Sequence, residues 1–140
     1  MDTTQLLKGV LDLAVLAVVS TEDGYGYDVV RRLRSAGLDD VGDASVYGTL
    51  RRLYSGGALT SYVVPSDEGP HRKYYGINPH GRALLAEQSQ TWAGFAATMT
   101  GLLADAGHDI RDTRPLTTAL GGSSESRATT TITSSREPVR

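Results

Sequence analysis

The chain has 140 residues, a formal net charge of −2 at pH 7 and no cysteine. Its length suits about one domain with a modest core, and the lack of cysteine excludes disulfides, thiolate metal sites and cysteine nucleophiles. Apolar residues make up 39% of the chain, which is below the globular average and predicts a non-globular stretch. No secretory signal or membrane span is predicted, because the apolar run Val10–Val19 is too short and contains Asp12. We therefore expect a cytoplasmic protein without a membrane partner.

A single helix is predicted from Thr3 to about Ser20, where apolar residues recur at spacings of three and four. The helix is apolar on nearly all sides, so it must be covered on two sides. Either a second subunit supplies one of the covers, or the helix is buried entirely within its own domain.

Two shorter helices are expected next. Residues Thr21–Tyr25 are predicted to form a turn, followed by a helix from Gly26 to about Ala36. A third helix is predicted from Ala44 to about Ser55, with Asp43 as its N-cap because the carboxylate can accept a free backbone N–H.

A β-hairpin is predicted in the middle of the chain. The runs Leu59–Val64 and Arg72–Ile77 are rich in β-branched and aromatic residues, and a turn-forming stretch separates them. Of the two adjacent tyrosines in the second run, Tyr75 is expected in the core and Tyr74 on the exposed face. Three helices followed by a hairpin is the order of a winged helix, so the fold class is mostly α (α+β).

A long final helix is predicted to begin at Asn78-Pro79, with Asn78 as N-cap. Its apolar residues follow the spacing of a coiled-coil seam: Leu85, Trp92, Phe95, Met99 and Leu102. The end of the chain is rich in Thr, Ser, Gly and Arg, which predicts disorder. The expected organisation is a winged-helix domain over residues 1–78, a dimerisation helix over 79–105 and a disordered tail over 106–140.

Charge is distributed unevenly along the chain. Between Gly26 and Arg82 there are eight basic and six acidic residues, which gives a local net charge of +2. DNA contacts require positive charge at the contact surface rather than over the whole chain. The overall charge therefore leaves a nucleic-acid partner open.

Four pieces of the sequence resemble the PadR family, in that family's order and spacing. They are Gly24–Val29, Ala44–Leu53, Arg72–Tyr75 and Asn78–Arg82. Residue Gly48 departs from the pattern, since the family usually has proline there. The resemblance implies a homodimeric repressor held together by its first and fourth helices. It would bind double-stranded operator DNA through two recognition helices. The alternative is a winged-helix dimer that acts mainly through protein contacts and has no ligand.

The candidate DNA-binding residues lie in the third helix and at the start of the second strand: Ser45, Tyr47, Gly48, Arg51, Arg52, Arg72 and Lys73. A helix fits the major groove, where hydroxyl and guanidinium groups can contact bases or phosphates and glycine permits close backbone approach. The alternative for Arg51 and Arg52 is a solvated helix face. Three further arginines could contact flanking phosphates or lie on the solvent surface: Arg31, Arg32 and Arg34.

The resemblance also implies an effector site, because some small members of the family bind flat aromatic compounds between paired tryptophans. Trp92 lies at the matching position, and its expected neighbours are Leu11, Asp12, Val15, Ser89, Ala96 and Met99. The alternative is that Trp92 packs in the core of the dimer. No catalytic residue, metal ligand or cofactor is predicted, because the histidines at positions 71, 80 and 108 have no metal-ligand spacing.

Overall fold

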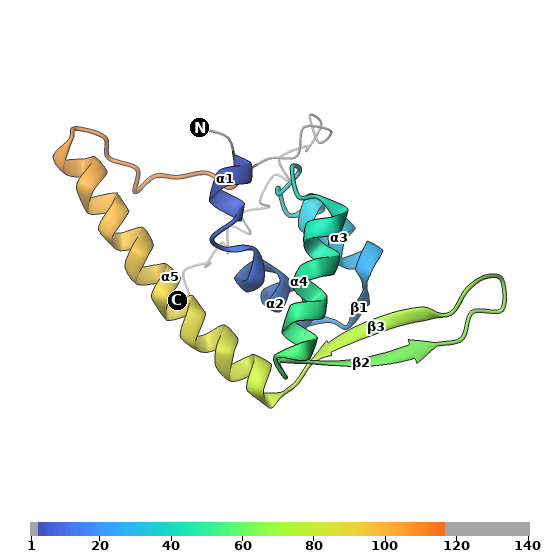
Figure 1. Ribbon diagram of the computed structural model, residues 1–140. Coiled ribbons are helices and arrows are strands. Elements are labelled where there is room, and N and C mark those ends of the chain that lie inside the picture. Colours follow the sequence, from blue (N-terminus) through green and yellow to red (C-terminus); the bar gives the residue numbers. More distant parts are fainter. Residues whose placement is uncertain (1–2, 117–140) are drawn as a thin grey trace, which may run out of the picture.

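The computed structural model describes residues 3–116 (Figure 1). In chain order its elements are α1 (Thr3–Leu7), α2 (Leu11–Thr21), β1 (Gly24–Tyr25), α3 (Gly26–Ser35), α4 (Asp43–Ser55), β2 (Leu59–Val64), β3 (Arg72–Ile77) and α5 (Pro79–Asp105). The order of helices followed by a hairpin confirms the predicted winged helix.

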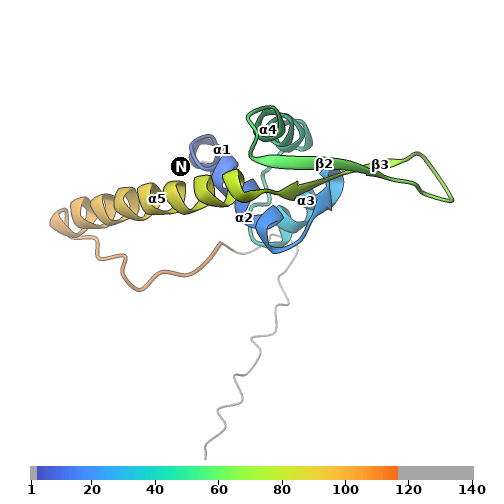
Figure 2. The ribbon, with the colours of Figure 1, turned by 90° about the horizontal axis from the view of Figure 1, so that it is seen from below.

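Helix α2 lies at the centre of the core. Its residues Val15, Leu16 and Val19 are at most 1% exposed, and the helix contacts α3, α4 and α5. Apolar residues of the two neighbouring helices complete the core: Val29, Val30 and Leu33 from α3, and Val46, Leu50 and Leu53 from α4. The hairpin and α5 leave this core in opposite directions (Figure 2).

The prediction of one helix from Thr3 to Ser20 is wrong, because residues 8–10 divide it into α1 and α2. The N–H of Val10 bonds to the carbonyl of Leu7 at 3.0 Å, and Val10 has a non-helical φ of −128° and ψ of 3°. Gly9 has little helix propensity, and Asp12 lies in the first turn of α2, where an acidic residue is favoured.

The predicted turn at Thr21–Tyr25 contains a strand. Gly24 and Tyr25 form β1, which pairs antiparallel with β3 and gives the sheet order β1-β3-β2. A strand of two residues is too short to show alternation in the sequence, so the periodicity could not reveal it.

The two predicted N-caps have different outcomes. Asp43 is the first residue of α4 and not its cap; the cap is Gly42, and the Asp43 carboxylate pairs with Arg34 at 2.8 Å. Asn78 is confirmed as the cap of α5, because its side chain accepts a 2.8 Å hydrogen bond from the N–H of Gly81 and Pro79 follows it.

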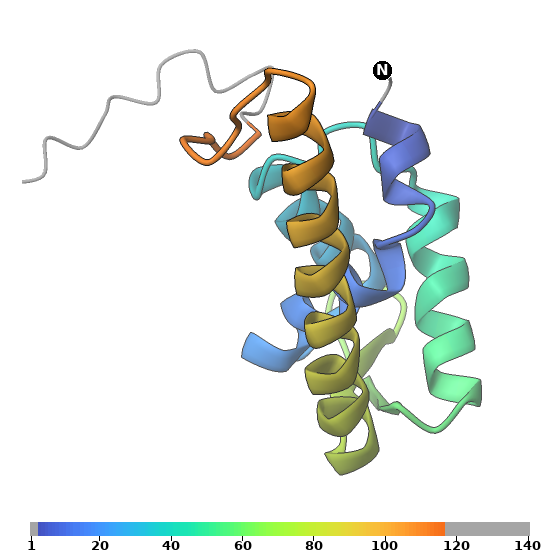
Figure 3. The same ribbon diagram turned by 90° about the vertical axis from the view of Figure 1, so that its left-hand side faces the viewer.

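Only the first part of α5 packs on the core, through Leu84 and Leu85. Figure 3 shows α5 lying across α2, which it contacts, and Figure 2 shows its C-terminal part projecting away from α1 and α2. After Asp105 the described chain has no regular secondary structure, and residues 117–140 of the predicted disordered tail lie outside the described residues. Within residues 3–116, no helix combines the length and apolar character needed to span a membrane.

One face of the sheet carries three tyrosine rings, one from each strand. Tyr74 is in register with Tyr25 and with Tyr62, at centroid distances of 5.5 and 5.7 Å. The Tyr62 hydroxyl donates a 2.6 Å hydrogen bond to Asp23, which precedes β1. Gly76 leaves room for this carboxylate, since a Cβ there would lie 2.8 Å from it. The base of the hairpin is thereby joined to the segment that follows α2. Tyr75 points the other way and is 6% exposed, as predicted.

The hydrogen bond to Asp23 raises the pKa of Tyr62 above its ordinary value of 10.0, because ionisation would remove the donated proton. Since the folded pKa is raised, the stabilisation from this bond is complete below pH 10 and is lost as the pH rises through the raised pKa. We expect Tyr62→Phe to lower the urea midpoint at neutral pH, and the difference from the unmodified chain to shrink above pH 10. A difference that is independent of pH would contradict this assignment.

Candidate nucleic-acid interface

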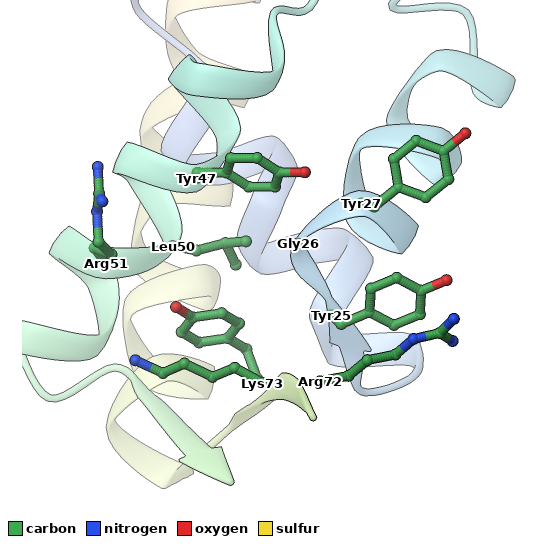
Figure 4. A pocket seen from close by; sticks show the side chains of 9 residues that line it. Tyr25, Gly26, Tyr27, Tyr47, Leu50, Arg51, Arg72 and Lys73 are labelled. Atoms are coloured by element: carbon green, nitrogen blue, oxygen red, sulfur yellow. The ribbon is translucent and has the colours of Figure 1, made fainter. Parts of the chain in front are cut away.

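An open groove of about 430 Å³ lies between the N-terminus of α3, one face of α4 and the start of β3 (Figure 4). We call it the interface groove, and its lining is Tyr25, Gly26, Tyr27, Tyr47, Leu50, Arg51, Arg72, Lys73 and Tyr75. It is positioned by the core helices, since Leu50 is fully buried in the core. Four of the residues predicted to bind DNA therefore meet at one place: Tyr47, Arg51, Arg72 and Lys73.

The other three predicted residues lie outside this lining. Ser45 is exposed and Gly48 is partly exposed on α4, outside the lining of the groove. Arg52 lies on a different face of α4 and pairs with Asp12 of α2, with nitrogen–oxygen distances of 3.1 and 3.2 Å. We therefore do not retain Arg52 among the residues of the interface.

The sequence prediction missed the contribution of residues 25–27. Tyr25 and Tyr27 form one rim of the groove, and a Cβ at Gly26 would overlap the ring of Tyr47. The absence of a side chain at Gly26 thus allows Tyr47 to lie on the first turn of α3. These residues belong to one of the pieces that resemble the PadR family, but no spacing argument placed them beside Tyr47.

Two cations of the groove, Arg72 and Lys73, lie over aromatic rings. The Arg72 guanidinium lies 4.7 Å from the ring centroid of Tyr25, and the Lys73 ammonium lies 5.1 Å from that of Tyr54. In the part of the chain that the structure describes, no carboxylate lies within 4.0 Å of Arg51, Arg72 or Lys73. Their charge is therefore available to an anionic partner.

The three arginines of α3 have partners within the chain. Arg31 pairs with Asp28, and Arg34 pairs with Asp43. Arg32 donates to the carbonyls of Val18 at 2.6 Å and Glu22 at 3.0 Å, so it satisfies acceptors at the end of α2. For these three arginines the contacts favour a structural role over contact with flanking phosphates.

A second cavity, of about 750 Å³, lies between the start of α2 and α5. We call it the α2–α5 cavity, and its lining is Gln5, Leu6, Lys8, Gly9, Val10, Asp12, Leu13, Arg52, Leu84, Glu87, Gln88, Thr91, Trp92 and Phe95. Two residues of the predicted effector site, Asp12 and Trp92, meet here. Phe95 and Arg52 were not predicted as part of this site.

The other predicted effector-site residues do not line the cavity. Val15 is 0% exposed in the core, so its placement beside a ligand is wrong. Leu11 packs against the same core, and the Ser89 hydroxyl bonds to the carbonyl of Leu85 at 2.6 Å within α5. Ala96 is partly exposed on α5 outside the lining. Among residues 3–116 there is also no cluster of three side chains suited to hold a metal ion.

Comparison with known proteins gives consistent matches. The family model described as "Transcriptional regulator PadR-like family" matches residues 15–87. The structure is similar to a PadR-like transcriptional regulator from Bacillus cereus, with 35% identity and a TM-score of 0.63, over 71% of this chain and 96% of that one. It is similar to a PadR family transcriptional regulator from Eggerthella lenta, with 30% identity and a TM-score of 0.66, over 72% and 88%.

A more distant match shows the fold alone. Bacillus subtilis PadR, solved in complex with operator DNA, is 20% identical with a TM-score of 0.52, over 56% of this chain and 46% of that one.

Proposed function

Because the chain belongs to the PadR-like family of transcriptional regulators, we propose that it binds double-stranded operator DNA as a homodimer and represses transcription. The observation that carries this proposal is the gathering of unpaired cations in the interface groove. Of the eight basic residues between positions 26 and 82, four are paired with carboxylates, and three of the other four line this groove.

Helix α4 would act as the recognition helix in the major groove. Its exposed residues Ser45 and Tyr47 lie in the first two turns, from which a recognition helix reaches base edges. Arg51 follows one turn later on the groove side, and Gly48 has no side chain to hold the backbone away from the duplex.

The hairpin and α3 would supply phosphate contacts. Arg72 and Lys73 begin β3 at the outer end of the hairpin, next to its turn, and both are exposed. The N-terminus of α3 also opens on the interface groove, and its cap residue Tyr25 makes no side-chain capping bond. Free backbone N–H groups at a helix start favour a phosphate.

The dimer would form through α5 and the α1–α2 segment. Large apolar side chains on the projecting part of α5 are exposed in the single chain: Trp92, Phe95, Met99 and Leu102, with exposed fractions from 39% to 65%. Leu6 of α1 is 57% exposed on the neighbouring side. A continuous apolar surface of this kind marks an interaction site, and a second copy would supply the missing cover for both helices.

The α2–α5 cavity would bind a planar aromatic effector. Trp92 and Phe95 provide rings for stacking, which contributes about 0.5–1.5 kcal/mol beyond burial. An effector would release DNA only if it preferred a dimer in which the two α4 helices have the wrong spacing. The competing role for Trp92 is packing in the dimer core.

Substitutions in the interface groove should separate phosphate contacts from base contacts. We expect Arg72→Ala to weaken binding to operator and to random DNA alike. Tyr47→Ala and Arg51→Ala should instead reduce the preference for operator, by about 1–3 kcal/mol for Arg51. Gel shifts with both duplexes measure the two affinities. Equal losses on both duplexes for every variant would contradict the assignment of α4 as the reading helix.

The single tryptophan makes the effector site directly measurable. We expect a planar tricyclic dye such as an acridine to quench Trp92 fluorescence saturably and to release bound operator. Trp92→Leu keeps an apolar side chain in the proposed dimer interface but removes the indole, so it should bind operator without responding to the dye. Absence of quenching at high dye concentration would assign Trp92 to dimer packing alone.

A further inference from the structure

Arg51 and Arg52 are adjacent in α4, but their side chains serve opposite sides of the helix. Arg51 lines the interface groove, and Arg52 lines the α2–α5 cavity. Successive residues of a helix differ by about 100° in direction, so one helix can present neighbouring cations to two different surroundings. Helix α4 therefore contributes to the walls of both cavities.

Arg52 forms a connected set of polar contacts that leads away from the interface groove. Its guanidinium donates to both carboxylate oxygens of Asp12, at 3.1 and 3.2 Å, and to the Thr49 hydroxyl at 3.2 Å. Thr49 is 1% exposed and donates in turn to the carbonyl of Ser45 at 2.8 Å. These contacts thus link Asp12 of α2 to Ser45 in the first turn of α4, where the proposed reading surface begins.

The partner residue belongs to α2, the helix that α3, α4 and α5 all contact. Asp12 lies one turn before Val15 and Leu16, which are both 0% exposed in the core. A two-point guanidinium–carboxylate contact restrains direction as well as distance. Helix α2 can therefore serve as the fixed reference for the orientation of α4.

We propose that Arg52 is a positioning residue that sets the orientation of α4 through Asp12, and that it does not contact DNA. The inference rests on the proposed function, because the orientation of α4 matters only if α4 reads a duplex. It separates two arginines that the sequence presents as an equivalent pair.

The expected effect on affinity is small, because the pair is partly open to solvent. The exposed fractions are 65% for the Arg52 side chain and 40% for that of Asp12. Such pairs contribute little to folding, so Asp12→Asn and Arg52→Gln should both remain folded. An affinity change of about fivefold at most corresponds to the range of exposed ion pairs.

Asp12→Asn gives a test in which the two possible roles of Arg52 predict opposite changes of operator affinity. If Arg52 positions α4, removal of the acidic partner weakens operator binding. If Arg52 contacts phosphate, removal of Asp12 frees the guanidinium and strengthens binding. We expect Asp12→Asn and Arg52→Gln to weaken operator binding equally, and the double variant to be no weaker than either single variant.

The salt dependence of binding provides the second readout, with Arg72→Gln as the control at a proposed phosphate contact. Loss of a phosphate contact lowers the slope of log K against log salt by about 0.9. We expect this loss for Arg72→Gln in each subunit and no change of slope for Arg52→Gln. Exchange of the two residues, Asp12→Arg with Arg52→Asp, should recover binding relative to Arg52→Asp alone.

Three outcomes would overturn the inference: tighter binding by Asp12→Asn, a reduced slope for Arg52→Gln, or no change of affinity in either variant. These outcomes differ from failure of the proposed function. In that case the unmodified chain itself would show no salt-dependent binding to DNA, whatever the variants do.

Discussion

The burial of α2 is the constraint on which the rest of the structure depends. This helix has apolar residues on nearly all sides, and α3, α4 and α5 all pack against it. Because α3 and α4 are held against the same helix, the start of α3 meets one face of α4 at a fixed place. The interface groove is the consequence, and β3 closes it through its pairing with β1.

The second determinant is the arrangement of charge. A chain with a net charge of −2 can still offer a cationic surface if its carboxylates neutralise the arginines elsewhere. Asp12, Asp28 and Asp43 do this for the arginines of α3 and for Arg52, whereas the groove cations have no carboxylate partner among the described residues. Three cations without a carboxylate partner among the described residues thereby gather on the surface that we propose for DNA.

The fold was largely predictable because its helices and hairpin have strong local signals. These signals all lie within short windows of sequence: the apolar spacing of α3 and α4, the Asn78-Pro79 start of α5 and the alternation of β2. The first helix is divided by a local turn at residues 8–10, and β1 forms by pairing with the distant strand β3. Apolar periodicity reports neither feature. The N-cap of α4 was also predicted wrongly. The Asp43 carboxylate pairs with Arg34 of α3, and the apolar pattern of the sequence does not show this contact.

The site was predictable in residue type but not in side-chain direction. Tyr47, Arg51, Arg72 and Lys73 were found by their chemistry. The sequence did not show that the adjacent side chains of Arg51 and Arg52 line two different cavities. The contribution of Gly26 could not be read either, because its importance lies in the space it leaves for the Tyr47 ring. Contacts between segments decide such questions, and a single sequence contains no record of them.

The central claim is that the unpaired cations of the interface groove form the surface that meets DNA. Chemical modification of arginines by phenylglyoxal, read by mass spectrometry with and without a bound duplex, tests it most directly. We expect DNA to protect Arg51 and Arg72 and to leave the modification of Arg31 and Arg34 unchanged. Protection of Arg31 and Arg34 in place of Arg51 and Arg72 would contradict it.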